Sequence, residues 1–181
     1  MSVINLKNKT THFFVFASVL YLAWYLLYEF FVKPHTLIDA KLISLIIANA
    51  AFILKLFGYT VYQSIEDENI QLIGVDGSHP LWIGSPCNAL TLFMFFALFV
   101  IAFPGKTKRK LWFIPLGIVV IHIINVLRIV ALIIINYHAP QYTEFNHTYT
   151  FTILVYSIIF LLWMWWVNSS LKELKANEEK P

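Results

Sequence analysis

Long apolar blocks constrain what this chain can fold into more than any other feature. They cover residues 13–32, 42–57, 88–103, 111–136 and 150–167. The longest of them reach the ~20 residues that a helix needs to cross a bilayer. Hydrophobic residues make up 59% of the chain and charged residues 13%, far from the composition of soluble domains. The sequence therefore predicts an all-α polytopic membrane protein, a bundle of about five transmembrane helices that forms a single domain over residues 1–181.

The block at residues 42–57 has two interpretations, because it is short and contains Asn49 and Lys55. A tilted span whose Lys55 side chain reaches the interface is one, and a re-entrant or surface helix is the other. We expect a span. If the block does not cross the membrane, four spans remain and the N-terminus moves to the cytoplasmic side.

Outside the blocks, residues 58–86 are the one sizeable segment. The first block is too long and too aromatic for a cleavable signal peptide, so we expect it to remain as a membrane anchor. Residues 58–86 form the predicted extracytoplasmic loop, in which Asp76-Gly77 separates two short β-prone runs. This pattern predicts a hairpin, with Pro80 at an edge. Residues 168–181 are the predicted cytoplasmic tail.

Residues 106–110 carry four cations and separate the third and fourth blocks. Loops this rich in Lys and Arg remain in the cytoplasm, so the sequence orients the chain. The start of the third block, the last third of the fourth and the start of the fifth then lie toward the outer face. These are the positions of Cys87, Arg128 and His147.

The remaining charge excludes some functions. The net charge of +3 sits mainly in short segments beside the apolar blocks, which suits orientation in a membrane and not nucleic-acid binding. Cys87 is the only cysteine, so an internal disulfide is excluded. A lone cysteine is more often a buried, unreactive thiol than a nucleophile, and its neighbours must decide.

Arg128 is the least expected residue in its apolar block. A charge inside an isolated membrane helix costs roughly 2.5–3.5 kcal/mol and usually faces a protein interior or a polar cavity. It recurs with His122 and Asn125 at every third position, which puts the three on one stripe of the helix. Arg128 either serves a function or pins a neighbouring helix, whereas His122 lies deeper and fits a hydrogen-bonded packing residue.

The polar groups predicted at the outer face suit acyl transfer. If Pro86 marks the turn into a helix, Cys87 lies at its N-terminus, where the thiolate is favoured. His147 and His138 both lie where a proton shuttle is needed, and an arginine stabilises developing negative charge. The spacing of His138, Glu144 and His147 matches no helical metal motif, so we expect chemistry without a metal or cofactor.

The order of three motifs resembles that of the exosortase/archaeosortase family. Residues 86–90 (PCNAL) open one apolar helix, residues 125–129 (NVLRI) lie in a later one, and Asn146-His147 precede the last, aromatic-rich helix. The resemblance covers roughly the last hundred residues. The chain is shorter than the larger exosortases and is similar to the compact Bacteroidetes-type members; Ala89 stands where a glycine often follows Cys-Asn.

The resemblance implies a cysteine transpeptidase of the bacterial inner membrane with its site on the extracytoplasmic side. Cys87 would be the nucleophile, Arg128 the transition-state stabiliser and His147 the general acid/base, with His138 as its alternative. We expect Asn88, Asn125 and His138 to contact substrate. The partners implied are membrane lipid and secreted proteins that end in a sorting motif, a transmembrane helix and a basic tail.

Two other functions fit the residues without the resemblance. In a non-catalytic membrane subunit, Arg128 and Asn125 would bind a partner helix, and in a small transporter the polar stripe would contact the solute. Both make Cys87 dispensable, whereas the transpeptidase requires it. The recognised motif and the final acceptor, whether water, lipid or another amine, stay open at this point.

Overall fold

A computed structural model describes residues 3–67 and 70–178. Of the predicted loop and tail, residues 68–69 and 179–181 lie outside the described part. The helices and turns are α1 (Val3–Leu27), η1 (Tyr28–Val32), α2 (Lys33–His35), α3 (Ile38–Leu56), η2 (Ser85–Cys87), α4 (Leu90–Ala102), α5 (Thr107–His138), η3 (Pro140–Tyr142), α6 (Thr143–Phe145), η4 (Asn146–Thr150) and α7 (Phe151–Glu178). Three segments are long and apolar enough to cross a membrane, namely Thr11–His35, Thr107–His138 and Pro140–Glu173, and α4 is a shorter apolar helix. The predicted all-α polytopic architecture is confirmed.

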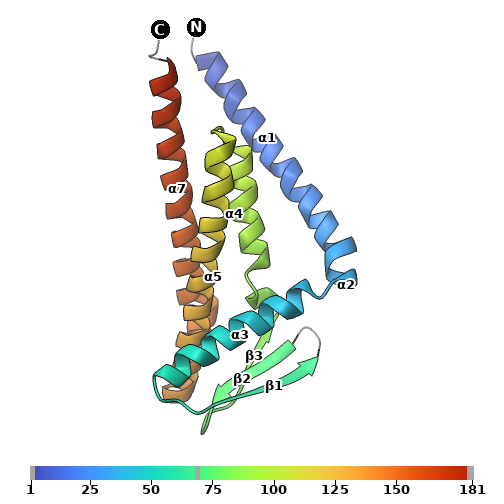
Figure 1. The fold of residues 1–181 in the computed structure, drawn as a ribbon, viewed down its shortest axis with the longest axis vertical. Coiled ribbons are helices and arrows are strands. Elements are labelled where there is room, and N and C mark those ends of the chain that lie inside the picture. The colour runs from blue at the N-terminus through green and yellow to red at the C-terminus, as the bar shows by residue number, and fades with distance from the viewer. Residues whose placement is uncertain (1–2, 68–69, 179–181) are drawn as a thin grey trace.

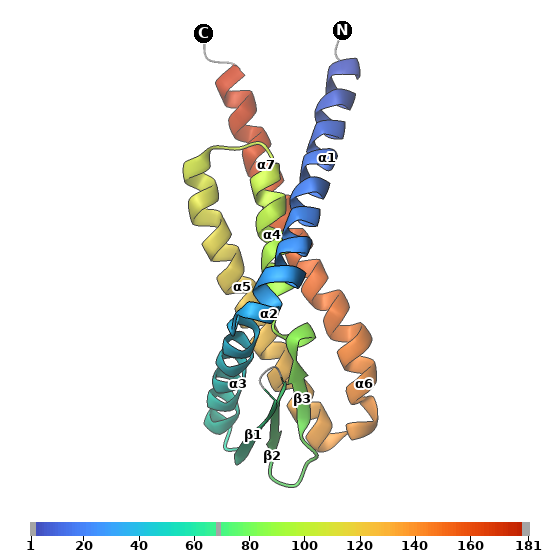
Figure 2. The same ribbon diagram turned by 90° about the vertical axis from the view of Figure 1, so that its right-hand side faces the viewer.

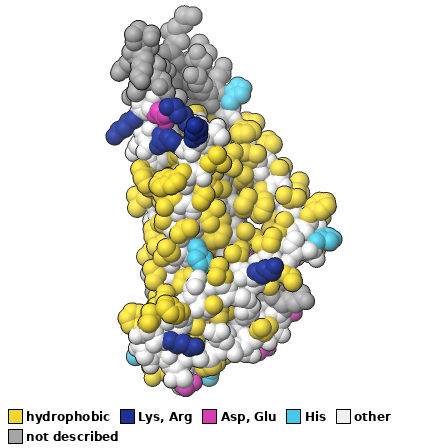
Figure 3. Space-filling model, viewed as in Figure 1, with side chains coloured by type: hydrophobic (Ala, Val, Ile, Leu, Met, Phe, Trp, Pro, Cys, Tyr) yellow, Lys and Arg dark blue, Asp and Glu magenta, His cyan; other side chains and the backbone are white. Residues whose placement is uncertain are grey.

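The chain runs up and down between two ends (Figures 1 and 2). The beginning of α1, the turn between α4 and α5 and the end of α7 lie together at the upper end of Figure 1, and a small sheet lies at the lower end. The cations of residues 106–110 therefore share an end with both ends of the described chain. Figure 3 shows Lys and Arg side chains gathered near this end, above a field of hydrophobic side chains.

The block at residues 42–57 does not extend the bundle. It belongs to α3, which runs crosswise beneath the other helices and lies on the sheet (Figure 1). Its buried residues repeat at helical spacing along one face, as an amphipathic helix requires: Ile43, Ile46, Ile47, Ala50, Ala51 and Leu54. Among the described residues, α3 is not one of the segments long and apolar enough to cross a membrane, because it carries Asp39, Lys41 and Lys55. Three long helices and α4 remain.

A three-stranded antiparallel sheet occupies the predicted loop, with strand order β1 (Val61–Asp67), β2 (Ile70–Val75) and β3 (Leu81–Gly84). The hairpin expected around Asp76-Gly77 is confirmed, because β2 pairs with β3. Gly77 has a φ of +87°, which glycine adopts without strain. The sequence did not indicate β1, the third strand.

Two buried clusters stabilise the two halves of the molecule. The lower cluster joins α3, the sheet and α5 and includes Cys87. The upper cluster joins α4, α5 and α7 around Phe96, Phe113 and Trp166, and it includes Ala89. The turn that carries Cys87 therefore lies where the two clusters meet.

Candidate active site

Cys87 lies on the turn between the sheet and α4. Strand β3 ends at Gly84, η2 covers Ser85–Cys87, and α4 begins only at Leu90. The thiol is thus not in the first turn of α4 as the sequence suggested, because Ala89 takes a left-handed conformation that interrupts the helix. At the start of α4, the Leu90 backbone N–H donates a 2.9 Å hydrogen bond to the Asn88 Oδ1 atom.

Among the described residues, Ala89 is the only non-glycine residue with a positive φ, which is +63°. L-residues pay roughly 1–2 kcal/mol for this conformation, and glycine does not. A glycine at this position would adopt the same backbone conformation without that cost.

The thiol faces a histidine from a distant part of the chain. Cys87 Sγ lies 3.8 Å from His147 Nε2, a distance at which the thiol donates to a neutral imidazole. His147 lies on η4, a π-helical turn directly before α7. Such wide turns often occur at functional sites, since they rotate side chains relative to a regular helix.

Cys87 and His147 line one cavity of about 220 Å³. Its walls are mostly apolar and come from β3 and α5, and Glu144 adds a carboxylate beside the histidine. Cys87 itself is 8% exposed. The thiol therefore lies at the wall of an apolar cavity with one base in contact, an arrangement that permits nucleophilic attack on a bound carbonyl.

Asn125 fixes the backbone of the nucleophile. Its Nδ2 donates a 2.7 Å hydrogen bond to the carbonyl oxygen of Cys87, and the side chain is fully buried. The predicted stripe on α5 does face protein, because His122 also contacts a neighbour, the Asn49 amide at 3.1 Å. Asn125 thus contacts the turn in this structure and not an open cavity.

Arg128 lies on the other side of the same turn. It lines a second cavity of about 290 Å³ together with Pro86, Asn88 and Ala89 of the turn and residues of α7 such as Thr152 and Tyr156. Its buried Nε has no hydrogen-bond partner among residues 3–67 and 70–178. The structure thus brings the guanidinium to the Cys87 turn, but in a cavity adjacent to that of the thiol.

His138 does not share either cavity. It ends α5 as an exposed side chain, and its Nε2 lies 3.3 Å from the Tyr59 hydroxyl. Of the two histidines weighed from the sequence, His147 contacts the thiol and His138 contacts the loop before β1. In the described part of the chain, no three His, Cys, Asp or Glu side chains lie close enough to hold a metal ion.

Sequence reasoning missed Asp39, which is 2% exposed. Its Oδ2 accepts a 2.9 Å hydrogen bond from the Tyr28 hydroxyl, and its Oδ1 accepts one from Asn88 Nδ2. Glu144, which the sequence suggested only as a possible metal ligand, accepts a 3.1 Å hydrogen bond from the Thr148 hydroxyl. An aspartate at the edge of an apolar block looks like any solvated flanking charge, so the sequence held no signal for Asp39.

Comparison with known proteins identifies the family. The sequence matches the family model of the transmembrane exosortases over residues 3–166, from α1 into α7. The chain belongs to the transmembrane exosortase family. Cys87, Arg128 and His147 all fall inside the matched region, and membership indicates a transpeptidase-like sorting function in the membrane. No curated protein and no solved structure matches this exosortase significantly.

Proposed function

We propose that this exosortase is a cysteine transpeptidase or protease that cleaves the C-terminal sorting signal of secreted proteins. The observation that carries the proposal is the 3.8 Å contact between Cys87 Sγ and His147 Nε2 at the wall of a cavity. Family membership supplies the class of reaction. Acyl transfer through a thioester requires a thiol, a base in contact with it and room for a peptide carbonyl.

The first half of the reaction forms the thioester. His147 Nε2 accepts the thiol proton while Cys87 Sγ attacks the scissile carbonyl carbon and forms a C–S bond. The carbonyl π electrons move to oxygen, and Arg128 stabilises the resulting negative charge. When the oxyanion collapses, the C–N bond breaks, and the imidazolium donates its proton to the leaving amine.

The second half releases the product. An acceptor, either water or an amine, loses a proton to His147 and attacks the thioester carbonyl. The C–S bond breaks, and the proton returns from His147 to the sulfur of Cys87. Because Arg128 lines the cavity next to that of the thiol and its Nε has no hydrogen-bond partner in the described part of the chain, we assign it to an oxyanion or to the peptide backbone of the substrate.

The proposed orientation places this chemistry outside the bacterial inner membrane. The cations of residues 106–110 lie at the opposite end from the sheet (Figure 1), and such loops remain in the cytoplasm. The chain forms one integral-membrane domain, with residues 58–86 outside and residues 168–181 inside. A secreted protein held by its own transmembrane helix then presents its sorting motif at the depth of Cys87.

The test is processing of a co-expressed substrate. Proteins encoded in the same genome that end in a shared motif, an apolar span and a basic tail are the candidates. With Cys87→Ala, the full-length precursor should accumulate, and wild type should yield the shorter product and a hydroxylamine-sensitive adduct. Ser157→Ala on α7 is the matched control. Normal processing by Cys87→Ala would favour a non-catalytic subunit and overturn the proposal.

The orientation has its own test. A membrane-impermeant maleimide added outside spheroplasts should label Cys87, the chain's only cysteine, and Cys87→Ala serves as the unlabelled control. Labelling that occurs only in inside-out vesicles would reverse the orientation.

A further inference from the structure

A buried carboxylate lies beneath the nucleophile turn, and the proposed reaction does not use it. Asp39 lies in the first turn of α3, is 2% exposed and lines neither cavity. Carboxylates are rarely buried without strong hydrogen bonds, because desolvation costs several kcal/mol. Both of its oxygens accept hydrogen bonds, one from Tyr28 and one from Asn88.

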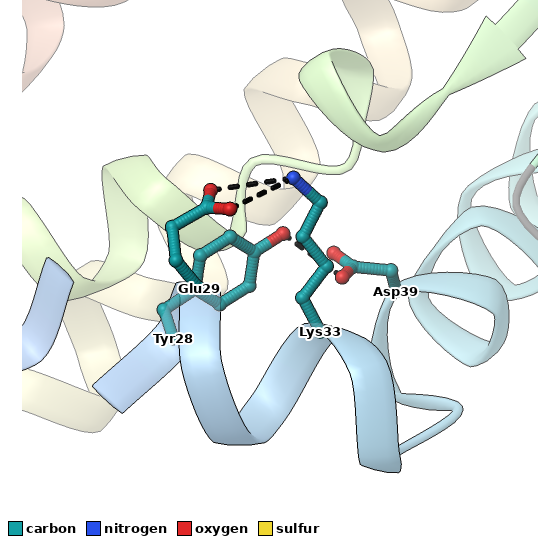
Figure 4. Close-up of polar contacts among 4 residues, drawn as sticks. All are labelled: Tyr28, Glu29, Lys33 and Asp39. Carbon is teal, nitrogen blue, oxygen red and sulfur yellow. Dashed lines mark hydrogen bonds and ion pairs between the residues drawn. The ribbon is translucent and has the colours of Figure 1, made fainter. Parts of the chain in front are cut away.

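These bonds form a chain that ends beside the thiol. Figure 4 shows the Tyr28 hydroxyl directed at the Asp39 carboxylate. The carboxylate holds the Asn88 amide, and the other end of that amide accepts the Leu90 backbone N–H at 2.9 Å. Asn88 follows Cys87 directly, so the orientation of its side chain sets the backbone that carries the sulfur.

The turn is held from two sides. Asn125 on α5 binds the carbonyl of Cys87 at 2.7 Å, and Asp39 on α3 holds Asn88. Ala89, the next residue, has a φ of +63°. An L-residue adopts this conformation only where its surroundings impose it. Without the carboxylate, the Asn88 amide would lose the partner that opposes relaxation of this backbone.

Tyr28 brings α1 into the same arrangement. Residues 11–35 carry no buried side chain, and the contacts of α1 with α4 include ring pairs such as Tyr21 with Phe95 at 6.0 Å. At its lower end, the π-helical turn η1 places Tyr28 on Asp39, and the Glu29–Lys33 ion pair of 3.0 Å lies beside this contact (Figure 4).

The other π-helical turn of the described chain, η4, carries His147. Two wide turns from opposite ends of the sequence thus carry the side chains that contact Asp39 and Cys87. Wide turns of this kind are uncommon and concentrate at functional sites.

We propose that Asp39 is a positioning residue for Cys87, and that Tyr28 makes the position of the thiol depend on where α1 lies. The proposal rests on the proposed function only for the role of Cys87 as nucleophile. Asp39 contacts neither the thiol nor His147 in the structure, so it acts through Asn88. A shift of α1 that withdraws the Tyr28 hydroxyl loosens the turn and separates the sulfur from its base.

The first experiment follows the thiol and needs no substrate. Cys87 is the only cysteine and 8% exposed, so its alkylation by N-ethylmaleimide in nanodiscs reports how often the turn opens. Hydrogen bonds to charged groups are strong, so we expect Asp39→Asn to raise the alkylation rate by about tenfold and Tyr28→Phe by about threefold. A matched control on the exposed side of the same segment, Tyr25→Phe, should stay within about twofold of wild type.

The second experiment separates positioning from general instability. A positioning role predicts a lower kcat for precursor processing at an unchanged KM, in Tyr28→Phe as well as in Asp39→Asn. The exchange Asp39→Asn with Asn88→Asp restores one hydrogen bond between the two positions with its direction reversed. It should recover part of the kcat and slow alkylation relative to both single variants, a coupling that independent destabilisation does not produce.

The outcomes distinguish the two proposals. Alkylation at the wild-type rate in both Asp39→Asn and Tyr28→Phe would overturn the positioning role, whatever happens to processing. Should Asp39→Asn fail to fold, Tyr28→Phe removes a single hydroxyl and decides the question alone. If alkylation responds as expected while wild type processes no sorting signal, the positioning of Cys87 stands and the proposed function fails.

Discussion

The two ends of the bundle use polar residues in opposite ways. At the upper end, Glu173 pairs with Lys106 and, at 2.8 Å, with Arg109, and the Arg109 guanidinium lies 5.3 Å from the Trp166 ring. The Lys106 side chain is largely exposed. At the lower end, Asp39, Asn88 and Asn125 are buried and bonded to one another or to the backbone of the Cys87 turn.

The ion pairs at the upper end and the buried polar groups at the lower end therefore have different roles. Exposed ion pairs contribute little to stability, and in the proposed orientation their cations keep residues 106–110 in the cytoplasm. Buried polar groups are costly unless fully paired, so they persist where a geometry must be held. The comparison predicts that changes of equal chemical size should have large effects at the lower end and small effects at the upper end.

The largest effect is expected at His147. His147→Gln removes the base from the thiol and should lower kcat for precursor processing by roughly 10²–10⁴-fold. The matched change His138→Gln should alter it by less than about threefold, because His138 contacts Tyr59 and not Cys87. The measurement is single-turnover processing in nanodiscs. Equal losses in both variants would mean that the 3.8 Å contact is not the catalytic one.

Arg128 should come next. Arg128→Lys keeps a positive charge but loses the planar fork of donors, so we expect kcat to fall roughly 10²-fold. Melting followed by tryptophan fluorescence in the same nanodiscs serves as the control for folding. A variant that processes normally would show that Arg128 only pins α7, through the cavity that it shares with Thr152 and Tyr156.

Ala89 tests the backbone of the turn. Ala89→Gly relieves a positive φ and should stabilise the protein by about 1 kcal/mol, partly offset by the greater freedom of glycine in the unfolded chain. The same change within α4, Ala97→Gly, should destabilise by about 1 kcal/mol or more. Thermal unfolding of the two variants side by side gives the answer. A lower melting temperature for both would contradict the strained turn.

The smallest effect is expected at the upper end. Glu173→Gln removes both ion pairs with the start of α5, those to Lys106 and Arg109. Melting should change only slightly, and the change should shrink as salt is added, because exposed pairs are screened. Processing should stay within about twofold of wild type. A large loss of processing would show that this end does more than orient the chain.

Much of this arrangement follows from local pattern. The apolar blocks predicted the four helices that run along the bundle, and Asp76-Gly77 predicted the β2–β3 hairpin. The amphipathic character of residues 42–57 was not visible in the block pattern, because block hydropathy averages over a helix. The buried face of α3 becomes visible only when the positions of Ile43, Ala50 and Leu54 are compared with those of Asp39 and Lys55.

By itself, the sequence determined the membrane class, the family resemblance and a short set of polar residues that includes Cys87, Arg128 and His147. Each of these rests on the chemistry of single residues and on local spacing, which a linear pattern records. Only the tertiary structure decided that His147 contacts the thiol, that Arg128 lies in the adjacent cavity, and that Asp39 lies beneath the turn. The physical reason is that hydropathy measures the transfer of a residue from water, whereas these roles depend on which side chains from distant segments pack together.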